Sequence, residues 1–225
     1  MTATIPPPRT ANLLPVRQLS RTEDGEQLPA LMWYAGPGWR MISSAVLGGG
    51  IGERAWVLNA QVAHGYRRTD PGRHLKQLAD EAGAHGIGVG LMTAADVRAY
   101  VHAEDGGTEA VVTAGVRIRG WAASPAEEKP VPVEPGTINI IAALPVPLSD
   151  SALVNAVATA TEAKVQALLD VGYDCSGTPT DAVCIAARTA RPGDDVHAFA
   201  GPRSLWGARL ARSVYNAVRG ALTWQ

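Results

Sequence analysis

GTINIIAALPVPLSDSALVNAVATATEAKVQALLDVGYDCSGTPTDAVCIAA, residues 136–187, is the stretch that decides the fold. It is typical of a strand, a proline-marked turn, a long helix, a loop rich in glycine and proline, and a second strand. A side-chain oxygen of Ser149 or Asp150 can accept hydrogen bonds from the free amides of the first helical turn. Gly172 can end the helix in a left-handed conformation. The pattern predicts a helix between two strands.

The helix expected over residues 153–170 has an aliphatic stripe, an alanine stripe and a polar remainder. At about 100° per residue, Lys164 falls between the two apolar stripes and Thr161 falls within the aliphatic one. Both side chains are therefore predicted to point inward. A buried ammonium group needs an anion or several acceptors; the alternative is a stem on apolar surface with its head in water. Periodicity places Thr159 and Glu162 on the solvated side.

The loop over residues 176–181, SGTPTD, places hydroxyl groups and a carboxylate directly before the apolar run of residues 182–187. Such residues turn the chain. They also present polar groups at the end of a strand, where open α/β sheets commonly bind ligands. Two interpretations stay open: Asp181 bonds backbone amides in an ordinary turn, or it belongs to a ligand site.

The composition fits one packed globular domain, with 225 residues, 46% of them hydrophobic, and a formal net charge of −1. That charge gives no electrostatic case for nucleic acid or an anionic membrane surface. No run approaches the roughly 20 apolar residues of a membrane span, and no signal-peptide pattern occurs, so we expect a cytoplasmic protein. Residues 1–29, polar and rich in proline, are predicted to be an extended or poorly ordered lead-in to a domain over residues 30–225.

A glycine-rich turn over residues 48–52, GGGIG, follows the strand-like segment of residues 39–47. Bare amides in such a turn can cradle an anion, but the terminal Lys-Ser/Thr of a phosphate loop and the G-x-G-x-x-G spacing are both missing. Residues 55–62 alternate like another strand. We therefore expect a β-hairpin whose glycines let a large ligand approach the backbone. Asn59, in the second strand, is either a sheet-surface residue or a ligand contact.

The order of elements predicts an α/β (α+β) fold, a single-domain layered sandwich of mixed β-sheet with helices packed on it. Residues 88–116 repeat the order strand, turn, helical piece, strand, so an internal two-fold repeat with residues 136–187 is a further hypothesis. The five histidines are isolated from one another, and neither C-x-x-C nor H-x-x-x-H occurs. A protein-bound metal is therefore not expected.

Five blocks, in order over about residues 30–220, together resemble the adenosylcobinamide amidohydrolase (CbiZ) family. The blocks are 43–52 (SSAVLGGGIG), 88–94 (GVGLMTA), 136–141 (GTINII), 161–164 (TEAK) and 177–183 (GTPTDAV). The resemblance implies a salvage enzyme that cuts the amide between a corrin-ring propionate and aminopropanol, giving adenosylcobyric acid for coenzyme B12 synthesis. It implies no cofactor beyond the cobalt of the corrinoid substrate itself. Residues 117–121, RIRGW, stand where many members have a Ser-Asn pair, which leaves the preferred corrinoid open.

Amide hydrolysis needs a nucleophile, donors for the tetrahedral oxyanion and an acid for the departing amine. We expect Asp181 to be the general base on water, Lys164 to stabilise charge or donate a proton, and Thr178 or Thr180 to contact the oxyanion. An alternative makes one of these threonines the nucleophile, activated by Lys164. Glu162 joins the catalytic set only through its family block. The expected substrate contacts are Ser43, Ser44, Gly48, Gly49, Gly50, Asn59, Thr93, Asn139 and Thr161.

Two rival functions stay open at this point. One is a non-catalytic corrinoid carrier or sensor that uses the same pocket, and the other is an amidase for an unrelated substrate. The expected partner is a small-molecule corrinoid, with neither nucleic acid nor membrane, and a homo-oligomer is allowed.

Overall fold

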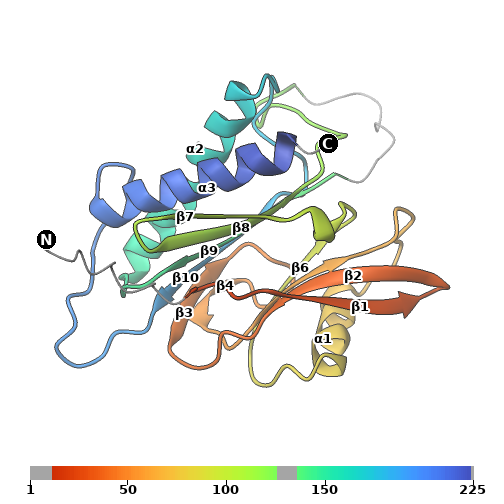
Figure 1. The fold of residues 1–225 in the computed structure, drawn as a ribbon, viewed down its shortest axis with the longest axis horizontal. Helices are drawn as coiled ribbons and strands as arrows, with labels where there is room; N and C mark the ends of the chain where they lie inside the picture. Colours follow the sequence, from red (N-terminus) through yellow and green to blue (C-terminus); the bar gives the residue numbers. More distant parts are fainter. Residues whose placement is uncertain (1–11, 126–135, 224–225) are drawn as a thin grey trace, which may run out of the picture.

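Two mixed β-sheets pack face to face, and helices cover the outer face of each (Figure 1). The computed structural model describes residues 12–125 and 136–223. The resulting order of layers is helix, sheet, sheet, helix in one domain, which confirms the predicted mixed α/β sandwich. None of the helices in the described ranges is both long and apolar enough to cross a bilayer.

The first sheet has four strands in the order β1-β2-β5-β6. Its elements are β1 (Arg17–Glu23), β2 (Glu26–Trp33), β5 (Val57–Gln61), β6 (Val89–Thr93) and the covering helix α1 (Pro71–Glu81). β1 and β2 form an antiparallel hairpin, whereas β5 and β6 run parallel and are connected through α1. Parallel neighbours need such a crossover connection.

The second sheet has six strands in the order β4-β3-β10-β9-β8-β7. Its elements are β3 (Trp39–Ser43), β4 (Gly50–Glu53), β7 (Val101–Asp105), β8 (Thr108–Ala114), β9 (Ile138–Leu144) and β10 (Ala182–Arg188), with α2 (Asp150–Asp170) and α3 (Leu205–Thr223) on its outer face and a single 3-10 turn, η1 (Val97–Ala99), before β7. The central strands β9 and β10 run parallel and are joined by α2. The strand, helix and strand predicted from the sequence are thereby confirmed.

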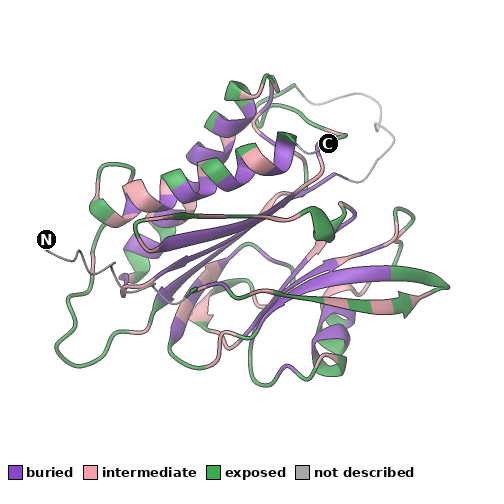
Figure 2. Cartoon of the chain, viewed as in Figure 1, coloured by how far each residue is buried: buried purple, intermediate pink, exposed green. Residues whose placement is uncertain are grey.

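Each face of β9 is covered by a different layer. Ile138 and Ile140 pack against α2 and α3, while Ile141 and Ala143 pack against the four-stranded sheet. All seven residues of β9 are buried, and a strand covered on both faces needs a continuous apolar run rather than alternation. Figure 2 shows this band of buried residues through the middle of the molecule.

The ends of α2 follow the predicted capping. The Ser149 side chain accepts a hydrogen bond from the Ala152 amide, and Gly172 has a φ of +94° just after the helix. The inward face is different from the prediction. Thr159 is buried, and Thr161 is exposed. The alanine stripe lies against α3 and the sheet together with Leu153 and Leu168 of the aliphatic stripe, whereas Val154 is exposed. The small alanine side chains let the helix approach its neighbours closely.

Three other expectations are corrected. Residues 17–29, predicted to be a lead-in, form β1 and half of β2, and residues 1–11 lie outside the described residues. The expected hairpin between residues 39–47 and 55–62 does not form: β3 pairs with β4, which lies within the predicted glycine turn, and residues 57–61 belong to the other sheet. The two-fold repeat is not found among the described residues, because β6 and β8 lie in different sheets, whereas β9 and β10 are neighbours.

Candidate active site

A buried ion pair joins the middle of α2 to the start of β10. Lys164 lies on the buried face of α2, and its Nζ is 2.5 Å from Oδ2 of Asp181. The two side chains are only 9% and 12% exposed. The prediction of an inward ammonium group is confirmed, and its partner is the carboxylate that the sequence placed at the loop end. Breaking such a pair by removing one partner leaves a buried charge uncompensated.

The Asp181 carboxylate accepts four hydrogen bonds. Oδ1 accepts from Thr178 Oγ1 at 2.6 Å and from the Ile138 amide at 2.9 Å. Oδ2 accepts from Lys164 Nζ at 2.5 Å and from the Thr178 amide at 3.2 Å. A carboxylate offers about four lone-pair sites, so these donors fill it. Asp181 therefore ties α2, the 176–181 loop and the start of β9 together, and Thr178 already directs its hydroxyl proton at it.

Gly177 allows the loop to pass directly over the ion pair. Its φ is +149°, and a Cβ atom at this position would lie 2.2 Å from Asp181 Oδ2 and 2.6 Å from Lys164 Nζ. Both separations are far shorter than van der Waals contact, and side chains other than hydrogen rarely adopt that backbone conformation. The glycine is thus required by the charged pair beneath it.

A hollow of about 440 Å³ lies beside this loop. Thr180 and Thr137 line it, and their hydroxyl oxygens are 2.6 Å apart. Thr180 also donates to the Gly136 carbonyl. Thr93 at the end of β6 lines the same hollow, as does the loop of residues 62–67. The hollow therefore lies between the ends of strands from both sheets, and it is rich in hydroxyl groups.

Asn59 and Asn139 support this hollow from within the molecule. Asn139 donates to Asn59 Oδ1 at 2.8 Å and to the Met92 carbonyl at 3.1 Å, and Asn59 donates to Thr113 Oγ1 at 2.9 Å. The two amide side chains are almost fully buried between the sheets. Asn59 is therefore not at the solvent-exposed surface of the sheet, and the contacts of its side chain are to Thr113 and Asn139 rather than to the hollow. Both amides hold β5, β6 and β9 in register behind Met92 and Thr93.

The serines of the first block are not at the hollow. Ser43 donates to the Val183 carbonyl at 3.0 Å, and Ser44 accepts from the Val183 amide at 3.1 Å. They fasten the end of β3 to the start of β10, two residues beyond Asp181. Their contacts are structural, and they act on the site through the strand that carries it.

The glycine turn serves backbone packing. A Cβ on Gly48 would lie 2.0 Å from the Gly88 carbonyl oxygen, and one on Gly49 would lie 2.7 Å from that of Ala45. Gly50 pairs with Ser43 at the start of β4. Gly88 is five residues before Thr93, so Gly48 is roughly 16 Å along the strand from the hollow. Gly48 and Gly49 therefore accommodate the chain's own backbone, whereas Gly50 has open space around its Cα and a φ of +80°.

Glu162 and Thr161 are on the outer side of α2. Both are exposed, and Thr161 donates to the Val157 carbonyl one turn earlier. Two residues of helix correspond to about 200° of rotation, so Glu162 points away from the face that carries Lys164. The structure therefore brings neither residue to the cluster of Lys164, Asp181 and Thr178. The inward orientation predicted for Thr161 is wrong.

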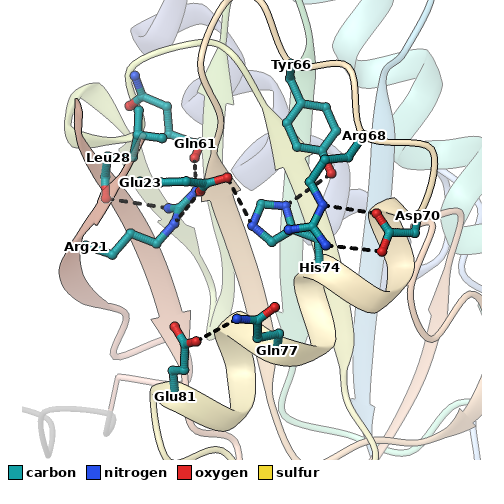
Figure 3. Close-up of polar contacts among 10 residues, drawn as sticks. All are labelled: Arg21, Glu23, Leu28, Gln61, Tyr66, Arg68, Asp70, His74, Gln77 and Glu81. Carbon is teal, nitrogen blue, oxygen red and sulfur yellow. Dashed lines mark hydrogen bonds and ion pairs between the residues drawn. The ribbon is translucent and has the colours of Figure 1, made fainter. Parts of the chain in front are cut away.

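A partly buried hydrogen-bond network holds the loop of residues 62–67, which forms part of the hollow's wall (Figure 3). Tyr66 Oη is 3.1 Å from His74 Nδ1, and His74 Nε2 is 3.2 Å from Glu23 Oε1. Arg21 donates to Glu23 and, at 2.7 Å, to the Gln61 carbonyl. Burial is the main cause that lowers the pKa of His74 and raises the pKa of Tyr66. A neutral His74 can accept a hydrogen bond from the Tyr66 hydroxyl at Nδ1 and donate one from Nε2 to Glu23.

Sequence reasoning missed Thr137 and the 62–67 loop. Thr137 lies within a family block, yet it meets Thr180 only because β9 and β10 are neighbours, 43 residues apart in the chain. The 62–67 loop carries no motif. Among the residues that the structure describes, no three histidine, cysteine, aspartate or glutamate side chains gather to hold a metal. The clustered groups are suited to acid–base and nucleophilic chemistry.

Comparison with known proteins assigns the family. The family model for CbiZ, adenosylcobinamide amidohydrolase, matches residues 15–225. The chain belongs to the CbiZ family. A protein of Methanosarcina mazei named adenosylcobinamide amidohydrolase is 31% identical to it over 186 residues, which are 80% of this chain and 88% of that protein. A protein of Halobacterium salinarum with the same name is 40% identical over 89 residues, 39% of this chain and 36% of that protein.

The CbiZ blocks contribute unequally to the cluster. Residues 136–141 and 177–183 meet there with Lys164 of a third block, through the Asp181 contacts. The block at 88–94 brings Thr93 to the hollow. The block at 43–52 supports β10 through its serines. The match begins at residue 15, so it includes β1 and β2.

Proposed function

We propose that this chain hydrolyses the amide between the corrin-ring propionate and aminopropanol of adenosylcobinamide, giving adenosylcobyric acid for cobalamin salvage. Membership of the CbiZ family and the similarity to the Methanosarcina mazei protein support this activity. The observation that carries it is the cluster of Lys164, Asp181 and Thr178, which adjoins the hollow through Thr180, the neighbour of Asp181 in the chain.

Thr178 is the nucleophile that the geometry supports best, because its hydroxyl already donates to Asp181 Oδ1 at 2.6 Å. As Oγ1 attacks the carbonyl carbon, its proton passes to Asp181. The C–N bond then breaks, the amine leaves with that proton, and water hydrolyses the threonyl ester. Lys164 bonds Asp181 rather than Thr178, so the base in this scheme is the carboxylate and not the lysine.

Lys164 supplies positive charge in a site largely screened from solvent. When Asp181 takes up the proton, the ammonium group stays charged, and its field favours the anionic tetrahedral intermediate. Thr180 and Thr137 present hydroxyl groups to the hollow. We assign the oxyanion contact to Thr137, whose hydroxyl can turn its proton from Thr180 Oγ1 toward the hollow, because Thr180 already donates to the Gly136 carbonyl.

Direct activation of water by Asp181 is the second scheme. It requires water to displace one of the four donors that fill the carboxylate. Loss of a charge-assisted hydrogen bond in a buried site is costly. The threonine scheme needs no such displacement.

The room around the site supports a corrinoid-sized ligand. Hollows of about 440, 510 and 550 Å³ adjoin one another at His64 of the 62–67 loop. Arg117, in the segment that departs from the family pattern, lines the second hollow. That position connects the altered segment to the choice among corrinoids. The cytoplasmic location and a homo-oligomeric state stay predictions.

The test is to incubate the purified protein with adenosylcobinamide and to measure adenosylcobyric acid and free aminopropanol by mass spectrometry. We expect equal amounts of the two products, and an acid-quenched sample should contain an ester on Thr178. Thr178→Val should abolish product, and the exposed Thr161→Val is the matched control. Tight corrinoid binding without product would instead indicate a carrier or sensor. Neither binding nor product would indicate an amidase for another substrate.

A further inference from the structure

His64 lies where the three hollows meet. It lines each of them, and its side chain is exposed. Within the described residues its imidazole makes no hydrogen bond and no ion pair. The ring nitrogens are therefore available to a ligand that enters from any of the three hollows.

The loop that carries His64 is fixed on both sides. The Tyr66 amide donates to the Ala63 carbonyl at 3.0 Å, which closes a tight turn around His64. The Tyr66 hydroxyl is held by His74, and Arg21 fastens the Gln61 carbonyl at the start of the loop (Figure 3). His74 is buried and is itself held by Glu23. A clamped loop loses little conformational entropy when its exposed side chain binds a ligand.

The substrate offers a group that matches a free imidazole. A corrinoid carries cobalt, and in cobinamide no base of the molecule itself occupies the axial position on the face from which the aminopropanol-bearing propionate hangs. Imidazole nitrogen is a common ligand for first-row transition metals. His64 lines the same hollow as Thr180 and Thr137. An imidazole bound to cobalt there would be on the same face of the ring as the amide to be cut.

We propose that His64 coordinates the cobalt of the bound corrinoid on the face that carries the scissile amide, and so places that amide beside the 176–181 loop. One cobalt–water bond breaks and one cobalt–nitrogen bond forms, and the oxidation state of the cobalt does not change. This assignment rests on the proposed function, since it requires a corrinoid in the hollow. It makes His64 a substrate-binding residue that sets the orientation of the ring.

Electron paramagnetic resonance of bound cob(II)inamide tests the proposal, because its unpaired electron lies along the axial direction and reports a nitrogen ligand as superhyperfine splitting. The proteins compared are the wild type, His64→Ala and His85→Ala. His85 is also exposed, but it follows the opposite end of α1. The expected result is nitrogen splitting in the wild type and in His85→Ala, and its loss in His64→Ala.

The outcomes separate the two proposals. Cob(II)inamide that binds to the wild type without nitrogen splitting, or splitting that survives in His64→Ala, would overturn the coordination by His64 and leave the proposed function standing. Failure of the wild type to bind cob(II)inamide and to release aminopropanol from adenosylcobinamide would overturn the proposed function, and the coordination with it. A further expected effect is at least tenfold weaker cobinamide binding by His64→Ala, measured by the change in visible absorption.

Discussion

Asp181 shows how one side chain can assemble a site. It takes donors from α2, from its own loop and from the first amide of β9, so the position of Thr178 depends on Lys164 and on Ile138. The inward orientation of Lys164 and its need for an anionic partner could be predicted from helical periodicity. The filled carboxylate could not, because two of its four donors are backbone amides, whose directions no residue type reveals.

Gly177→Ala tests whether this geometry matters. The new Cβ would clash with Asp181 Oδ2 and Lys164 Nζ, and the backbone would be strained at a φ of +149°. The backbone strain alone should lower the free energy of unfolding by about 1–3 kcal/mol. We expect at least a tenfold loss of kcat/KM on adenosylcobinamide, with stability measured by urea unfolding. Gly193→Ala is the control, since its φ is +90° but its Cβ would meet nothing within 4 Å.

In this comparison both variants should lose stability, and only Gly177→Ala should lose activity. Wild-type kcat/KM in Gly177→Ala would show that the spacing of the charged pair is unimportant to turnover.

Helix α2 shows the limit of periodicity at the scale of one element. Its start, its end and the burial of Lys164 follow from capping residues and from the 3.6-residue period. The period predicts the wrong side of the helix for two residues. Val154 is 57% exposed although it belongs to the aliphatic stripe, and Thr159 is 1% exposed although it is predicted to face solvent. An alanine-rich stripe carries little hydrophobic signal, yet its small volume is what lets α3 pack closely.

Two threonines on α2 give a matched pair for stability. The Thr159 hydroxyl donates to the Ala200 carbonyl at 2.8 Å in the core, while the exposed Thr161 donates only to its own helix. Thr159→Val should lower the free energy of unfolding by about 1 kcal/mol. Thr161→Val should change it by less than about 0.5 kcal/mol. Equal effects in urea unfolding would contradict the assignment of the inward face.

At the scale of the whole molecule, the sandwich class could be predicted, but the division into two sheets could not. Residues 39–62 contain three short strands, and the apolar pattern of each strand does not say which strands pair. β3 and β4 belong to one sheet and β5 to the other. The hollow forms only because this division brings the end of β6 and the 62–67 loop to the start of β9 and β10. The family blocks include Thr93 and Thr180, so these two residues could be predicted from the sequence. The 62–67 loop, which lines the same hollow, could be identified only from the fold.

The decisive measurement for the role of Asp181 as the base is the release of aminopropanol from adenosylcobinamide by Asp181→Asn, compared with the wild type and Asp150→Asn. Asp150 pairs with Arg40 on the surface and is the control for loss of an ion pair. We expect a rate lower by about 10²–10⁴-fold for Asp181→Asn and an unchanged rate for Asp150→Asn, with circular dichroism and cobinamide binding confirming that both variants are folded. A folded Asp181→Asn protein that releases aminopropanol at the wild-type rate would contradict that role.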